Sequence, residues 1–201
     1  YRLLQETGLH PDIAIRIAFG TSLFVVLINA INVALNYHQK NAVLWKQATI
    51  MGIFGSIFSF VGAAVASYLP ASTLSKIFGI VVIVGALRIY LAPAVTETKY
   101  ISSNSLPYIF AGIFIGFFSG LLGLGGGVIG IPIMLIFLHF DMRKAIGTTS
   151  AVIIFTSFSG SIGYIINGWG QVGLPPYSVG YVNILNWILL SFPALHRASE
   201  V

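Results

Sequence analysis

The chain has 201 residues, of which 57% are hydrophobic and only 7% are charged, and its formal net charge is +5. An ordinary soluble domain carries about 25% charged residues, so the composition argues against a soluble globular protein and predicts an integral, multi-pass membrane protein. The ten Lys and Arg residues are scattered rather than gathered in a basic stripe, which argues against nucleic acid as a partner, and the lack of cysteine excludes disulfides and thiolate metal sites.

Three apolar segments occupy the first half of the chain, and each reaches the length of roughly 20 residues that a helix needs to cross a bilayer. We expect membrane helices over residues 17–37, 45–69 and 74–93. The second segment has small residues three and four positions apart on one face, which favours close helix packing over a pore lining: Gly52, Ser56, Ser59, Gly62 or Ala63, and Ala66. We assign residues 1–95 to a first half and residues 96–106 to a polar linker.

Residues 107–201 form the predicted second half, with apolar segments at 107–139, 145–166 and 181–195. The first of these is too long for one untilted crossing, and it is interrupted by glycines and a proline: Gly123, Gly125, Gly126, Gly127 and Pro132. Because lone strands cannot span lipid, we expect an all-α, polytopic bundle of about six segments with no sheet and with one glycine-broken helix.

An internal repeat links the two halves. Shifting the chain by 127 positions aligns residues 16–37 with residues 143–164 and gives six identities across 22 positions. The pairs are Arg16 and Arg143, Ala18 and Ala145, Gly20 and Gly147, Thr21 and Thr148, Val25 and Val152, and Tyr37 and Tyr164. The pattern predicts a duplication of the kind common in secondary transporters. In this register the copy of the glycine-rich segment would lie largely before residue 1, and the copy of the third helix after residue 201.

The glycine run at residues 123–127 predicts a helix break within the membrane. A half-helix beginning near Val128 would aim its N-terminus inward, where its free N–H groups and partial positive charge favour an anion. The alternative is that the glycines only permit close helix crossing or a kink with Pro132. If the segment crosses the membrane once, the two repeats run parallel; if it folds back, they are inverted.

Hydroxyls and arginines near two helix starts are further candidates for anion binding. Thr148, Thr149 and Ser150 follow Arg143, while Thr21 and Ser22 follow Arg16. Hydroxyls and a guanidinium can bind an oxyanion. They can also cap a helix or bond to its backbone, and an arginine can reach the lipid headgroups instead.

Asn29 and Asn32 lie three residues apart, deep in the first apolar segment. Polar side chains in lipid need partners, so we expect this face to look into the bundle, as interhelical contacts or as lesser substrate ligands. The residues leave an anion transporter and a structural or accessory subunit open. A membrane-embedded enzyme is disfavoured because no catalytic carboxylate, thiol or metal cluster is visible, and no cofactor is predicted.

Two motifs resemble a known family. Residues 116–127 read GFFSGLLGLGGG and are followed by Pro132, and residues 145–150 read AIGTTS. Both are similar to the signature of the TauE/SafE membrane family, and AFGTS at residues 18–22 resembles its first-half copy. LPPYSVGYVN at residues 174–183 is similar to a loop in one branch of that family.

The resemblance implies a multi-pass protein of an inner or plasma membrane, an exporter or permease that moves sulfite, sulfonates or related sulfur-containing anions. It implies a small anion and the lipid bilayer as partners, with a homo-oligomer left open. Combined with the residues, it predicts that the anion lies where the glycine run faces Thr148, Thr149 and Ser150, with Asn29 and Asn32 opposite.

Overall fold

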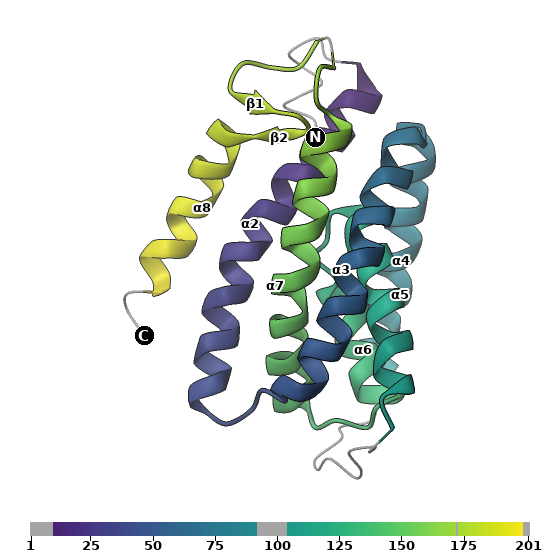
Figure 1. Ribbon diagram of the computed structural model, residues 1–201, viewed down its shortest axis with the longest axis vertical. Coiled ribbons are helices and arrows are strands. Elements are labelled where there is room, and N and C mark those ends of the chain that lie inside the picture. Colours follow the sequence, from purple (N-terminus) through teal and green to yellow (C-terminus); the bar gives the residue numbers. More distant parts are fainter. Residues whose placement is uncertain (1–9, 92–103, 172, 199–201) are drawn as a thin grey trace.

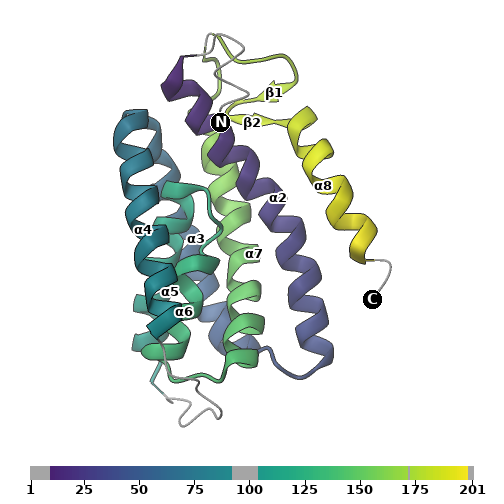
Figure 2. The same ribbon diagram turned by 180° about the vertical axis from the view of Figure 1, so that it is seen from behind.

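The computed structural model describes residues 10–91, 104–171 and 173–198, which form seven helices and one short hairpin (Figures 1 and 2). The helices are α2 (Pro11–Gln39), α3 (Trp45–Tyr68), α4 (Ala71–Leu91), α5 (Leu106–Leu122), α6 (Gly127–Ile136), α7 (Met142–Asn167) and α8 (Ile184–Ala198). The all-α fold is confirmed. The expectation of no sheet is wrong in one place, because β1 (Ser178–Val179) pairs antiparallel with β2 (Val182–Asn183).

Three helices form the frame of the bundle. Among the described residues, α2, α3 and α7 are long and apolar enough to cross a membrane, with 29, 24 and 26 residues. The apolar stretches of α4, α5 and α6 are shorter. Helix α7 packs against both α2 and α3, so the three long helices lie side by side along the bundle (Figure 1).

Small residues let α3 and α5 approach closely. A Cβ atom placed on Gly112 would lie 2.7 Å from the Cα of Met51, and one placed on Gly120 would lie 2.9 Å from the Cα of Ser59. Halfway between them, Gly116 meets the backbone of Gly55. Glycines four residues apart on α5 therefore face α3 along a whole stripe, as expected for helices that associate through backbone contact in lipid.

The segment predicted at residues 107–139 folds back on itself. Residue numbers rise together along the α5–α3 contact, from Gly112 with Met51 to Gly120 with Ser59, so these two helices run parallel. The next helix, α6, runs the other way against α7: Gly125 lies near Ser157, whereas Gly130 lies near Thr149. The rings of Tyr108 and Phe140 then meet at 6.4 Å, so the chain returns to the level where α5 began.

The repeated helices α2 and α7 run antiparallel and make reciprocal contacts (Figures 1 and 2). A Cβ on Gly20 would lie 3.0 Å from Tyr164 Cβ, and a Cβ on Gly147 would lie 2.9 Å from Tyr37 Cβ. Because Gly20 aligns with Gly147 and Tyr37 aligns with Tyr164, the same contact is made twice. Such reciprocity is what a twofold relation between two copies requires, and it matches the inverted arrangement expected when the glycine-rich segment folds back.

Buried hydroxyls tie the same elements together. The Oγ1 of Thr21 accepts a hydrogen bond from the backbone N–H of Asn183 at 3.0 Å, just before α8. The Oγ1 of Thr148 accepts one from the N–H of Leu44 at 3.1 Å, just before α3. Thr21 in α2 therefore contacts the start of α8, the helix that follows α7. Thr148 in α7 contacts the start of α3, the helix that follows α2. In this arrangement α8 is the counterpart of α3.

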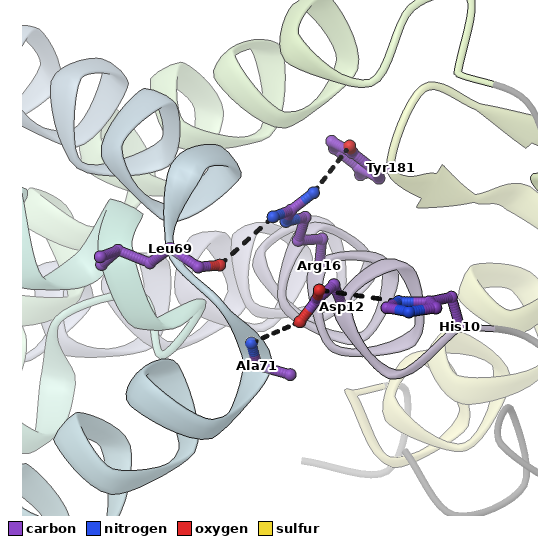
Figure 3. A network of polar contacts seen from close by, with 6 residues as sticks. All are labelled: His10, Asp12, Arg16, Leu69, Ala71 and Tyr181. Carbon is purple, nitrogen blue, oxygen red and sulfur yellow. Dashed lines mark hydrogen bonds and ion pairs between the residues drawn. The ribbon is translucent and has the colours of Figure 1, made fainter.

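A polar network holds one end of the bundle together (Figure 3). Arg16 donates to the backbone oxygen of Leu69 at 3.2 Å and to the hydroxyl of Tyr181 at 3.4 Å. Asp12 Oδ1 accepts from the N–H of Ala71 at 2.6 Å, and its other oxygen lies 3.6 Å from His10 Nδ1. These contacts join α2 to the α3–α4 turn and to the hairpin.

Candidate functional site

The break between α5 and α6 is made by four glycines, Gly123, Gly125, Gly126 and Gly127, which we call the glycine break. Three of them have positive φ angles: +67° at Gly123, +68° at Gly125 and +83° at Gly126. Only glycine adopts this conformation without steric cost. Gly123 ends α5, and Gly126 precedes the first residue of α6, so the sequence signal for a broken helix is confirmed.

The glycine break lies between α2 and α7. A Cβ on Gly123 would come within 2.6 Å of the Cα of Phe19, and one on Gly125 would lie 3.1 Å from Ser157 Oγ. Gly125 also meets the side chain of Val26. The turn is therefore enclosed by the two repeated helices, and a side chain larger than hydrogen would collide with them at Gly123 and Gly125.

The start of α6 presents backbone donors inside the bundle. The N–H groups of Ile129 and Gly130 both donate to the Gly126 oxygen, at 3.3 and 2.7 Å. The N–H groups of Gly127 and Val128 belong to the first helical turn, where no carbonyl of the same helix is available. No side chain caps this end, so the donors and the positive end of the helix dipole are directed to the glycine break.

The hydroxyls predicted to face the glycine break lie nearer the start of α7, two turns before the residue that contacts the break. Thr149 touches α6 at Gly130 and donates to Met134 Sδ at 3.0 Å. Ser150 donates to its own helix at Ile146 O, and Thr148 holds the start of α3. Thr149 is eight residues from Ser157, which is roughly 12 Å along the helix. Thr148, Thr149 and Ser150 are all buried and all have protein partners.

The candidates on α2 are placed differently from expectation. Thr21 is buried, as described above, but Ser22 and Asn29 are exposed and Asn32 is half-buried in the described bundle. The expectation that the asparagine face looks into the bundle is therefore wrong for Asn29. The reason is that α2 turns its small residues Gly20, Ala30 and Ala34 toward its neighbours, which directs Asn29 outward.

The two repeated arginines have separate surroundings. Arg143 is exposed in the first turn of α7, fourteen residues or roughly 21 Å before Ser157. Arg16 is part-buried and bonds Leu69 and Tyr181. The hydrogen bonds of Arg16 go to Leu69 and Tyr181 and not to a residue of the glycine break.

Ser157 and Ser161 are the residues that sequence reasoning missed. Their exposed fractions are 0% and 1%, and neither hydroxyl has a hydrogen-bond partner among the described residues. The signal was present in the repeat: the same alignment pairs them with Ala30 and Ala34, so α7 has serine where α2 has alanine.

Comparison with known proteins gives the family. The family described as Sulfite exporter TauE/SafE matches residues 7–196. The chain is 32% identical over 190 residues to a probable membrane transporter protein of Methanocaldococcus jannaschii, covering 94% of this chain and 69% of that protein. A probable membrane transporter protein of Haemophilus influenzae is 26% identical over 180 residues, covering 90% and 68%. No solved structure matches the chain. The chain therefore belongs to the sulfite exporter TauE/SafE family of membrane transporters.

Proposed function

We propose that this transporter moves small sulfur-containing anions, such as sulfite or organosulfonates, across an inner or plasma membrane as an exporter or permease. We further propose that the anion binds at the start of α6. The family description supports the substrate class. The competing function, a structural or accessory membrane subunit, predicts no anion flux.

The observation that carries this proposal is the start of α6 at the glycine break. An oxyanion that leaves water must replace its hydration with other donors. The N–H groups of Gly127 and Val128 and the helix dipole supply donors and partial positive charge. Because these donors carry only partial charges, binding stays weak enough for release, which a carrier requires.

We assign the other candidate residues to lesser roles in the same function. Thr149 lines α6 and is proposed to border the route of the anion, with Thr148 and Ser150 beside it. Arg143, exposed at the start of α7, is proposed to attract anions to the entrance. Ser22 and Asn29 are proposed as weaker contacts on the corresponding face of α2, together with Thr21 and Asn32.

We also propose that residues 1–95 and 107–201 act as the two inverted halves of a carrier. The reciprocal contacts between α2 and α7 support this division. In transporters built from inverted repeats, the substrate site lies near the repeat interface, and one half rocks against the other. The glycine break lies between the two repeated helices, where such a site is expected.

The test is sulfite flux in proteoliposomes, with Gly127→Ala as the variant. Gly127 has no positive φ, and a Cβ there would meet only the flexible end of Ile153 at 3.3 Å. Alanine favours a helix over glycine by about 1 kcal/mol, so the variant should fold at least as well as the parent. We expect sulfite flux to fall about tenfold, because a methyl group at the helix start weakens one donor contact, worth about 1.4 kcal/mol.

Gly79→Ala in α4 is the matched control, since no atom lies within 4 Å of a Cβ at this position. This variant should retain the flux of the parent. The proposal fails if the parent transports neither sulfite nor any sulfonate above the rate of empty liposomes. The placement at α6 fails if Gly127→Ala transports as well as Gly79→Ala.

A further inference from the structure

Helix α7 buries two serine hydroxyls for which the described residues provide no hydrogen-bond partner. Ser157 and Ser161 are four residues apart and therefore lie on one face of the helix. Both hydroxyl oxygens are inaccessible and have no hydrogen-bond partner among the described residues. A buried hydroxyl without a partner has lost its hydration and gained no hydrogen bond in return, so the pair is a cost to folding.

Ser157 and Ser161 lie on the face of α7 that contacts the end of α5 and the glycine break. Ser157 Oγ is 3.1 Å from the position of a Cβ on Gly125. One turn beyond Ser161, the hydroxyl of Tyr164 donates to Leu121 O at 3.3 Å, just before α5 ends. Ser161 lies between these two contacts on α7. Both unpaired hydroxyls are therefore placed on the side of α7 that meets the glycine break.

The other hydroxyls of α7 show that the unpaired state is particular to these two serines. Ser159 donates to Ser56 O at 2.7 Å, and Thr156 donates to Ile153 O at 3.3 Å. In the repeated helix α2, the aligned residues are Ala30 and Ala34, which are also buried. The repeat itself thus shows that alanine packs at this position between the helices.

We propose that Ser157 and Ser161, together with the N–H groups of Gly127 and Val128, form the receptor for a small oxyanion. This inference rests on the proposed transport function and names the side chains of that same site. Residues four apart on a helix have Cβ atoms roughly 5–6 Å apart. One oxyanion spans that gap by accepting from each hydroxyl with a different oxygen, at about 2.7–2.8 Å.

The receptor belongs to one repeat only. Because α2 carries alanine at both aligned positions, its face lacks the two hydroxyl donors. Within the described part of the chain, the two repeated helices therefore provide one serine receptor and not two, although they are related by near-symmetry.

The experiment separates binding from folding in the full chain. Ser157→Ala, Ser161→Ala and the double variant are purified in detergent, and sulfite binding is measured by calorimetry alongside the Tm without sulfite. Each single variant is expected to keep or raise the Tm and to raise the Kd for sulfite about tenfold, equivalent to about 1.4 kcal/mol. Ser157→Cys retains most of the volume with a weaker donor and is expected to weaken binding in the same direction.

Ser159→Ala is the matched control on the same helix. It removes the hydrogen bond to Ser56 O, so it is expected to lower the Tm and to leave the Kd for sulfite unchanged. The inference is overturned if Ser157→Ala and Ser161→Ala behave like this control. If the parent binds neither sulfite, sulfate nor a sulfonate, the proposed function falls and the receptor falls with it. If the parent binds sulfite and the double variant binds equally well, only the receptor is wrong.

Discussion

At the scale of single residues, a side chain from one helix completes the start of another. Pro70 precedes α4 and has no side-chain acceptor for the free N–H groups of the first turn. Asp12, on α2, accepts from the N–H of Ala71 at 2.6 Å and takes that role (Figure 3). A carboxylate at a helix N-terminus is also favoured by the helix dipole.

Asp12→Ala should therefore lower the stability of the protein by about 0.5–2 kcal/mol, the usual effect of losing an N-terminal cap. Asp12→Asn retains the accepting oxygen and is expected to lose much less. Thermal unfolding in detergent measures both variants. Equal losses from alanine and asparagine would show that the charge, and not the hydrogen bond, is what stabilises this end.

At the scale of elements, the α3–α5 contact depends on the absence of side chains. The glycines of α5 place its backbone directly on α3, and the Oγ of Ser59 donates to Thr156 O of α7 at 2.7 Å. The same face of α3 therefore contacts both α5 and α7. Without a hydrophobic force between helices in lipid, such packing and hydrogen bonds provide the association.

Gly116→Ala should disrupt this contact, because the new methyl group would collide with the backbone of Gly55, which cannot move aside as a flexible side chain does. The loss is expected to be about 1–3 kcal/mol or more, as for overpacked cores. Size-exclusion profiles and thermal unfolding in detergent measure it. Gly79→Ala, where the added methyl group meets no atom, should behave like the parent, and an unaffected Gly116→Ala would refute the close packing.

At the scale of the whole molecule, two antiparallel repeats make the same contacts in reverse. Thr21 accepts a hydrogen bond from the N–H just before α8, and Thr148 accepts one from the N–H just before α3. The connection after α7 is longer than the one after α2, yet it brings the chain to the equivalent hydrogen bond. The fold thus preserves the contact even where the loop lengths differ.

Thr21→Val and Thr148→Val should each destabilise the protein by about 1–3 kcal/mol, because valine keeps the shape but leaves a backbone N–H unpaired. Thr→Ser at either position retains the acceptor and should lose less. Unfolding of the four variants in detergent is the measurement. If only one of the two threonines affected stability, the equivalent hydrogen bonds would not stabilise both repeats.

Four properties of this protein follow from its residues alone: the membrane environment, the helical class, the repeat and the place of the helix break. These properties depend on local chemistry. A chain with 7% charged residues cannot cover itself with a water-soluble surface. The glycines of the break permit positive φ angles whatever the direction of the helix that follows. An Arg, a Gly-Thr pair and a Tyr that align at one shift of the sequence identify a duplication without coordinates.

The packing of the folded chain was needed to show that α6 returns beside α7, that the repeats are inverted, and which hydroxyls have partners. Thr148 looked available in sequence, but Leu44, more than a hundred positions away, donates to it. Asn29 looked buried by its depth in an apolar segment, but the small residues of α2 take the interior face. Ser157 is at the glycine break because α6 runs antiparallel to α7. Partners of this kind are set by contacts between distant segments, and the one-dimensional pattern does not record them.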